Sequence, residues 1–270
     1  MVSSIEREGS GALEKWRLRD GDALCEVVPG RGALVSRFCV GGDEVLFLDE
    51  ATLRDESKNV RGGVPVLFPF AGKPPPGSSL PQHGFARRSR WDARGEAGEV
   101  VCVLRDDDTT RSAFPFAFEV RQRVALDGRA LRLTWEFENR GAEPMPLHFG
   151  IHPYFRVSAA AKAKVRVAGA RGEAFDNKAG VMRVVDAVDF SQGEVDLHFA
   201  ARGGGTVLER GDGSRVSLEW SEAFDTLVVW TLPGADFVCV EPWTARGAKP
   251  ATRFVAAGKT DVAVVSMRLT

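Results

Sequence analysis

Long apolar runs and blocks of like charge are both missing from this sequence. No apolar stretch of the 270-residue chain approaches the ~20 residues that a membrane-spanning helix needs, and the N-terminal segment MVSSIEREGSGALEKW has no apolar core of signal-peptide length. The 36 basic and 37 acidic residues nearly cancel, so a nucleic acid or an anionic membrane is a poor candidate for a partner. We therefore expect a soluble, cytoplasmic protein.

Cysteine is scarce and shows no paired motif. The four cysteines form no CxxC pair and no spacing typical of a zinc site, and each stands in an apolar, strand-like stretch: Cys25, Cys39, Cys102 and Cys239. Buried free thiols in a reducing compartment are the expected outcome, with disulfides as the alternative.

Helical periodicity is missing as well. No stretch keeps a 3.6-residue apolar period for three turns, and only a short helical piece near Ala51–Lys58 is expected. Short β-like runs separated by turn signals fill most of the chain, and Asp127-Gly128 between two of them favours a tight hairpin. Because a parallel α/β sheet would need helices in its connections, the pattern predicts an all-β fold. The predicted strands are Ala23–Val28, Ala33–Val40, Glu44–Leu48, Val64–Phe70, Val100–Leu104, Glu119–Leu126, Ala130–Glu138, Val165–Ala168, Gly205–Glu209, Arg215–Trp220, Thr226–Leu232, Phe237–Val240 and Val262–Leu269.

Some of these strands are apolar on both faces. Thr226–Trp230 (TLVVW) and Phe237–Val240 (FVCV) lack the alternation expected of a strand with one face in water, which indicates large, curved sheets that stack closely. No change of composition marks a domain boundary, so residues 1–270 are predicted to form a single domain, in which residues 1–20 could lie at the periphery. The proline-rich stretch Gly72–Gln82 (GKPPPGSSLPQ) is predicted to be a surface loop.

Two segments in the first third of the chain hold residues that could carry chemistry. In Arg61–Phe70 (RGGVPVLFPF), two glycines and two prolines bend the backbone at both ends of an apolar run. Either Arg61 serves a ligand there, or the segment is a kinked edge strand with a solvated charge. In Gln82–Arg87 (QHGFAR), His83 stands on a turn, and the Arg87 guanidinium offers donors suited to hydroxyls, carboxylates or a phosphate. A plain surface turn is the alternative.

A third segment, Leu147–Phe155 (LHFGIHPYF), holds two of the four histidines and the single tyrosine. His148 and His152 have the spacing of the helical HExxH zinc motif, but the glutamate is missing, prolines flank the pair, and the aromatic and β-branched residues favour a strand. On a strand the two rings would lie roughly 13 Å apart, too far for one metal ion, so no metal site is predicted. Pro153 should hold His152 in extended geometry. A buried core histidine is the alternative for either residue.

The fourth segment, Val238–Thr244 (VCVEPWT), places Glu241 at the end of a strongly apolar strand. A carboxylate there is costly to bury, so it must reach water, find a partner or serve a site that shifts its pKa. A solvent-exposed strand end is the alternative.

With all four segments in view, the sequence resembles the aldose 1-epimerase (galactose mutarotase-like) family, and within it the bacterial branch that includes the hexose-6-phosphate mutarotases. The matching pieces are RGGVPVLFP, the HGFAR turn at 83–87, HPYF at 152–155 and EPWT at 241–244, in the family's order over about residues 20–270. A weaker match, EVDLHF at Glu194–Phe199, departs from the Asp-Arg-Ile-Tyr common in relatives. The resemblance implies a galactose mutarotase-like β-supersandwich of large, stacked, mostly antiparallel sheets.

The same resemblance implies roles for six residues. His152 matches the general acid that acts on the ring oxygen, and Glu241 matches the base that takes the proton of the C1 hydroxyl. The positions that hold sugar hydroxyls or, in the phosphosugar branch, a phosphate are matched by Arg61, His83, Arg87 and Asp196. The expected function is the cofactor-free interconversion of the α- and β-anomers of a hexose or a hexose 6-phosphate.

Two other functions are compatible with these residues. A non-catalytic carbohydrate-binding protein could share the fold, although a pure binder has no need for a paired histidine and glutamate. A glycosidase would need two carboxylates, Glu241 and Asp196, and would leave His152 without a task. The sequence leaves open which sugar is bound, whether it carries a phosphate, the oligomeric state, whether the proline-rich loop is a lid, and the roles of Arg88 and Arg90.

Overall fold

Antiparallel β-sheets make up most of the molecule. The computed structural model describes residues 4–246, 251 and 253–270, and every pairing between two named strands in this part is antiparallel. The two α-helices are short, α1 (Glu50–Arg54) and α2 (Asp108–Ala113). None of the described helices has the length and apolar character to cross a membrane. The predicted all-β class is confirmed.

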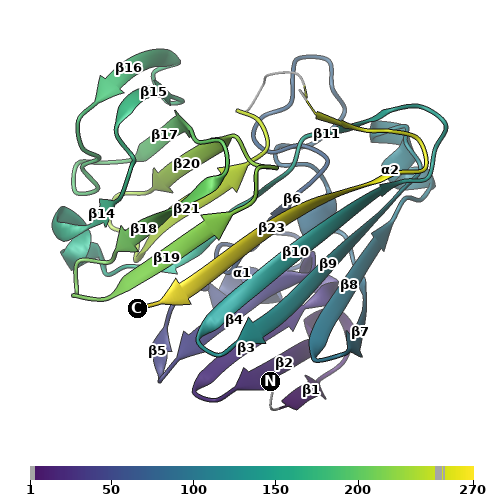
Figure 1. Ribbon diagram of the computed structural model, residues 1–270, viewed down its shortest axis with the longest axis horizontal. Coiled ribbons are helices and arrows are strands. Elements are labelled where there is room, and N and C mark those ends of the chain that lie inside the picture. Colours follow the sequence, from purple (N-terminus) through teal and green to yellow (C-terminus); the bar gives the residue numbers. More distant parts are fainter. Residues whose placement is uncertain (1–3, 247–250, 252) are drawn as a thin grey trace.

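A broad eight-stranded sheet forms the face turned toward the viewer in Figure 1. Its long central strands alternate buried and solvent-facing side chains, as expected when one face of a sheet meets water. In spatial order the strands are β14 (Arg166–Val167), β18 (Gly204–Glu209), β19 (Arg215–Trp220), β23 (Thr260–Leu269), β10 (Ala130–Asn139), β9 (Phe118–Asp127), β8 (Glu99–Arg105) and β7 (Asp92–Glu96).

A five-stranded sheet from the N-terminal part of the chain lies in the lower part of Figure 1. It is a simple meander in which each strand pairs with the next, and β3 is buried along its whole length. The strands are β1 (Ser4–Glu8), β2 (Lys15–Asp20), β3 (Ala23–Val28), β4 (Leu34–Val40) and β5 (Asp43–Glu44).

The sheet that matters for function contains the two strands that are apolar on both faces. All seven residues of β21 and five of the six in β20 are buried, which agrees with the close stacking predicted from their sequence. The order is β16 (Val181–Val185), β15 (Gly172–Asp176), β17 (Val195–Ala200), β20 (Thr226–Thr231), β21 (Phe237–Trp243), β12 (Gly150–Ile151) and β6 (Val66–Leu67), and β13 (Tyr154–Arg156) also pairs with β21. A separate pair joins β11 (Met145–Leu147) to β22 (Arg253–Val255).

One large apolar core lies between these sheets, and a buried chain of hydrogen bonds crosses it. The indole of Trp135 in β10 donates to the Gln122 side chain in β9 (2.9 Å), and Gln122 donates to the carbonyl of Ala33, beside β4 (2.8 Å). These two hydrogen bonds therefore connect the broad sheet to the N-terminal meander. All four cysteines are buried and free, as predicted.

Several local features differ from the predictions. The β9–β10 hairpin exists, but Asp127 pairs with Ala130, so the turn residues are Gly128 and Arg129. The strand expected over Val64–Phe70 is reduced to the two residues of β6 with isolated bridges on either side. The strand expected over Glu44–Leu48 is likewise reduced to the end of β5, with isolated bridges at Leu46 and Leu48. Helix α2 was missed because its capping box uses Thr110 in place of the usual glutamate or glutamine, with Asp107 as the N-cap.

Candidate active site

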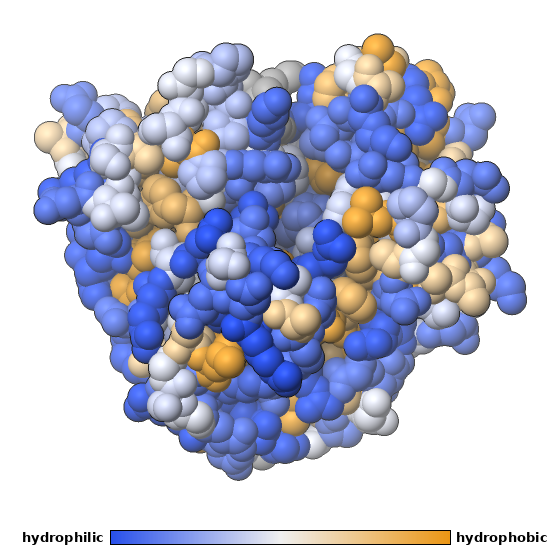
Figure 2. Space-filling view, turned by 180° about the vertical axis from the view of Figure 1, so that it is seen from behind, coloured by the Kyte–Doolittle hydropathy of each residue, from blue (hydrophilic) through white to orange (hydrophobic). Residues whose placement is uncertain are grey.

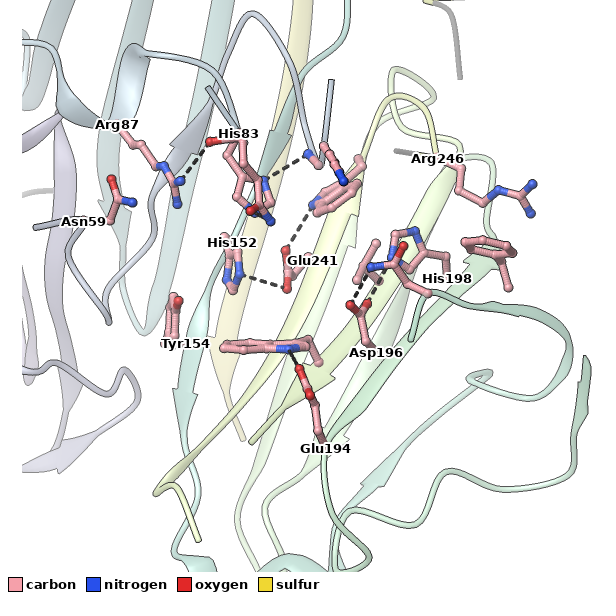
Figure 3. A pocket seen from close by; sticks show the side chains of 18 residues that line it. Asn59, His83, Arg87, His152, Tyr154, Glu194, Asp196, His198, Glu241 and Arg246 are labelled. Carbon is pink, nitrogen blue, oxygen red and sulfur yellow. Dashed lines mark hydrogen bonds and ion pairs between the residues drawn. The ribbon is translucent and has the colours of Figure 1, made fainter. Parts of the chain in front are cut away.

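A cavity of about 730 Å³ opens on the face of the sheet formed by β17, β20 and β21. The opposite side of the molecule from that in Figure 1 is hollowed near its centre, with mostly hydrophilic residues at the border (Figure 2). Histidine, carboxylate, guanidinium and indole groups all line the cavity, and they come from segments between Asn59 and Arg246. Figure 3 shows how these side chains converge.

Glu241 lies at the centre of the cavity wall. Successive odd-numbered residues of β21 share one face of the sheet, which places Cys239, Glu241 and Trp243 in a row. The carboxylate is 1% exposed and accepts a hydrogen bond from the Trp243 indole (3.1 Å). Burial, with a smaller contribution from nearby Asp196, raises the pKa of this carboxyl well above its usual value.

His152 faces Glu241 across a short gap. Its Nε2 lies 3.4 Å from the near carboxylate oxygen of Glu241, and its ring stacks on Tyr154 with the centroids 4.6 Å apart. Burial and the positive charge of Arg87 lower the pKa of the imidazole to about 3. Both pKa shifts therefore favour the uncharged forms of the two groups, which are a neutral imidazole and a protonated carboxyl.

The RGGVP segment holds the backbone on which His152 stands. The amide of His152 donates to the Pro65 carbonyl (3.1 Å), and the amide of Tyr154 donates to the Gly63 carbonyl (2.9 Å). Gly63 has a φ of 63°, and a Cβ there would lie 2.3 Å from the Val35 carbonyl oxygen, so only glycine fits. Gly63 and Pro65 thus fix the His152–Tyr154 backbone through main-chain hydrogen bonds.

His83 reaches the cavity from the end of the proline-rich loop. Its backbone has a φ of 66°, a left-handed conformation that places it on a turn as predicted. The ring Nδ1 accepts from the Gly72 amide (3.0 Å), and the ring lies edge-on to His152 at a centroid distance of 5.7 Å. Burial, followed by the charges of the neighbouring cationic groups, lowers the pKa of His83 well below its usual value.

Arg87 approaches from a 3₁₀ turn (Ala86–Arg88) at one end of the cavity. One terminal nitrogen donates to the Gln82 carbonyl (2.9 Å), whereas Nε is buried without a hydrogen-bond partner. Burial lowers the pKa of the guanidinium. The guanidinium borders the cavity, where its planar set of donors is suited to the oxygens of a ligand.

Asp196 lies at the other end of the cavity, in β17 (Figure 3). Its two carboxylate oxygens contact different partners, the Asn177 amide at 2.7 Å and His198 Nε2 at 3.1 Å. The ring of His198 is buried, and its Nδ1 has no partner. Arg87 and Asp196 therefore stand at the two ends of the cavity, with the His152–Glu241 pair between them.

Five of the six residues singled out in the sequence line this cavity, and Arg61 does not. Arg61 is exposed, and its main chain bonds to Thr52 and Asp49, so its role in ligand binding stays a prediction. Arg88 donates to the Ser57 carbonyl and Arg90 to the Gly11 carbonyl, and neither lines the cavity.

The prediction of one continuous extended strand through both histidines of the third segment was wrong. The segment is divided between β12 and β13, and His148 precedes β12. His148 is buried outside the cavity, where it stacks on Phe70. The two imidazoles therefore lie in different environments, His152 on the cavity wall and His148 outside the cavity.

One group of side chains has a donor set typical of a zinc site. Ligand atoms of His152, Cys239 and Glu241 lie within 4.8 Å of one another, all buried. The thiol is fully buried and packs among Tyr154, Phe237 and Trp230. An ion could reach the Cys239 sulfur only if a covering side chain moved aside.

Sequence reasoning missed several residues of the cavity wall. Tyr154 and Trp243 stood inside motifs that had been singled out, but no role was assigned to them. Glu194, His198 and Lys73 also stood inside quoted segments, EVDLHF and the proline-rich stretch, without a role. For the remaining residues proximity depends on how distant segments pair: Asn59, Phe175, Asn177, Val228, Trp230 and Arg246.

Comparisons with known proteins identify the family. The family model described as aldose 1-epimerase matches residues 14–262. A protein from Cenchrus ciliaris, provisionally named as a glucose-6-phosphate 1-epimerase, is 29% identical over 236 residues, which cover 81% of this chain and 70% of the relative.

Two solved structures show the same fold over nearly the whole chain. The Slr1438 protein from Synechocystis sp. PCC 6803 has a TM-score of 0.90 at 30% identity, covering 97% of this chain and 99% of the other. YeaD from Salmonella typhimurium, provisionally described as a mutarotase, has a TM-score of 0.82 at 20% identity, with 98% and 93% covered. The second likeness is evidence for the fold alone.

Proposed function

Because the chain belongs to the aldose 1-epimerase family of isomerases, we propose that it interconverts the α- and β-anomers of a hexose with His152 and Glu241 as its acid–base pair. The observation that carries the proposal is the 3.4 Å approach of His152 Nε2 to the Glu241 carboxylate on the wall of the cavity. A binding protein without catalysis would gain nothing from two facing groups that can exchange a proton.

The chemistry needs one proton on the pair and no cofactor. In the ring form, the Glu241 carboxylate takes the proton of the C1 hydroxyl, the bond between C1 and the ring oxygen breaks, and the His152 imidazolium protonates that oxygen. The product is the open-chain aldehyde. Each such transfer is worth on the order of 10²–10⁴ in rate.

Reclosure reverses the proton transfers after rotation about the C1–C2 bond. During the open-chain stage the pair consists of a neutral imidazole and a protonated carboxyl, the forms that burial favours at these two residues. The site is thus suited to lowering the energy of the ring-opened intermediate. His83 and Asp196, which line the same cavity, would hold sugar hydroxyls on either side.

A direct test replaces the base. Glu241→Gln keeps the shape of the side chain but removes the proton acceptor, so kcat should fall by at least about 10³ while sugar binding persists. Exchange between anomers measured by NMR, with affinity measured by calorimetry, separates the two effects. Glu219→Gln, an exposed change on β19, is the matched control, and a Glu241→Gln enzyme as active as this control would refute the mechanism.

The substrate is proposed to carry a phosphate, held by Arg87. The support is the position of Arg87 and Lys73 on the cavity wall, together with the glucose 6-phosphate named for the Cenchrus ciliaris relative. A planar guanidinium binds phosphate oxygens through charge-assisted hydrogen bonds.

Arg87 and Arg88 are adjacent in the sequence, which allows a matched test of this substrate. Arg87→Ala should lower kcat/KM for glucose 6-phosphate by about 10- to 100-fold and change kcat/KM for glucose far less. Arg88→Ala, whose guanidinium contacts the Ser57 carbonyl outside the cavity, should change neither. Equal losses on both sugars in Arg87→Ala, measured by NMR exchange or polarimetry, would remove the phosphate from the proposal.

A further inference from the structure

Two histidine rings bind consecutive backbone amides at the start of the proline-rich loop. The Ala71 amide donates to Nδ1 of His148 (3.1 Å), and the Gly72 amide donates to Nδ1 of His83 (3.0 Å). A backbone N–H is always a donor, so Nδ1 must be the unprotonated nitrogen in both rings. In each neutral ring the proton therefore resides on Nε2. The Gln82 side-chain amide, 3.4 Å from Nε2 of His83, can then meet that N–H only through its oxygen.

The bond between Gly72 and His83 joins the two ends of the proline-rich loop. The His83 amide donates back to the Gly72 carbonyl (2.8 Å), so Gly72 and His83 are joined by two hydrogen bonds. The next residue, Gly84, is equally constrained, since a Cβ there would lie 2.2 Å from the Phe68 carbonyl oxygen. The position of His83 in the cavity consequently depends on the position of the Ala71–Gly72 turn.

His148 holds that turn from outside the cavity. It is 2% exposed, its ring stacks on Phe70 with the centroids 3.9 Å apart, and it does not line the cavity. Its Nε2 is buried with no partner. Leaving a polar atom unpaired in the core is unfavourable, and an aliphatic side chain would fill the same space without that cost. The bond to the Ala71 amide is the contact that an aliphatic residue could not provide.

We propose that His148 is a positioning residue, which fixes the Ala71–Gly72 turn so that His83 presents its Nε2–H to the sugar as a hydrogen-bond donor. The inference rests on the proposed function for its effect on turnover. It assigns His83 as a donor in the cavity, and it gives the second histidine of the LHFGIHPYF segment a task that does not require contact with substrate.

The experiment compares two variants of the full-length protein. In His148→Asn, the amide oxygen is attached to Cγ like Nδ1 and can accept from the Ala71 amide, whereas His148→Leu offers no acceptor. His148→Leu should raise KM at least about tenfold with a smaller change in kcat, because an interaction made in both the ground state and the transition state is weakened. His148→Asn should restore KM to within about threefold of the wild-type value.

Two NMR measurements test the positioning without any turnover. The Ala71 amide should be protected from hydrogen exchange in the wild type and in His148→Asn, and it should lose that protection in His148→Leu. The ¹⁵N shifts of the His83 ring should show the Nε2–H tautomer in the first two proteins and a mixture of tautomers in the third. These readouts stand even if no sugar is epimerised, so failure of the proposed function and failure of this inference are distinguishable.

The outcomes that would overturn the inference are equally specific. If His148→Leu keeps the protected amide, the single tautomer and the wild-type KM, His148 is a packing residue only. If His148→Asn behaves like the leucine variant in all three readouts, the acceptor at Nδ1 is not what matters. Should His148→Leu fail to fold, His148→Gln takes its place, since its amide is displaced by one carbon and cannot superpose on Nδ1.

Discussion

The surroundings of Glu241 shift the pKa of its carboxyl in opposite directions. Burial, and then the charge of Asp196, raise the pKa of its carboxyl, whereas the hydrogen bond from the Trp243 indole favours the carboxylate and lowers the pKa. Because His152 lies 3.4 Å away, the two groups titrate as a pair. Loss of the pair's single proton at high pH removes the acid, and gain of a second proton at low pH removes the base.

Trp243→Phe should therefore shift the alkaline limb of the kcat/KM profile upward by about one pH unit, since one hydrogen bond to the charged form is worth about 1 kcal/mol. The acid limb should stay well below pH 6.5, because the pKa of His152 is lowered to about 3. Trp16→Phe is the matched control, as its indole also donates to a glutamate, Glu14, and it does not line the cavity. A Trp243→Phe profile that coincides with the control would contradict the assignment.

At the scale of elements, the relative placement of two sheets depends on buried polar groups as well as on apolar packing. Gln122 is 1% exposed and bridges Trp135 in β10 to the Ala33 carbonyl beside β4. No apolar residue can replace both contacts at once. The glutamine thus fixes how β9 and β10 lie against the N-terminal meander.

Gln122→Leu should lower the free energy of unfolding by about 2–4 kcal/mol, because it leaves a buried indole N–H and a buried carbonyl without partners. Urea titration gives this value, and Gln192→Leu, an exposed change, should alter stability by less than about 0.5 kcal/mol. Epimerase activity per folded molecule should not change, since Gln122 does not line the cavity. A loss no larger than that of the control would show that water replaces the glutamine.

For the whole molecule, buried neutral histidines make stability depend on pH. Burial lowers the pKa of His148 to about 4 and that of His152 to about 3, and it lowers the pKa of His83 as well. Below about pH 6.5 the unfolded chain binds protons that the folded protein does not, so stability falls as the pH falls. Glu241 acts with the opposite sign, since its raised pKa means that the folded state holds a proton that the unfolded state has lost.

The three histidines should consequently outweigh Glu241, so that the free energy of unfolding falls as the pH falls. Between about pH 6 and pH 5, each buried neutral histidine contributes a loss of up to about 1.4 kcal/mol per pH unit in the free energy of unfolding. His148→Leu should reduce the slope of the wild-type protein by up to that amount, as measured by urea unfolding at several pH values. An unchanged slope would mean that His148 has the same pKa in the folded and the unfolded protein.

The strand content and the residues of chemical interest could be predicted from local sequence. Alternation, turn dipeptides and proline punctuation act over a few residues, which is why most of the predicted strands and the α1 region agree with the structure. Local signals were weaker where backbone contacts between distant segments decide the conformation. The region Val64–Phe70 reads as a strand, yet its glycine-flanked backbone follows the contacts it makes with Val35 and with the His152–Tyr154 segment.

The sequence by itself determined the fold class, the family resemblance and the candidates His152 and Glu241, because these depend on residue type and order. Only the tertiary structure decided which candidates meet. His152 and Glu241 are 89 positions apart, and they face each other because β12 and β13 both pair with β21. Arg61 lies away from the cavity and His148 binds a loop amide, outcomes that follow from non-local main-chain hydrogen bonds. The direction of a side chain after a glycine or a proline is set by those bonds, and no local pattern contains them.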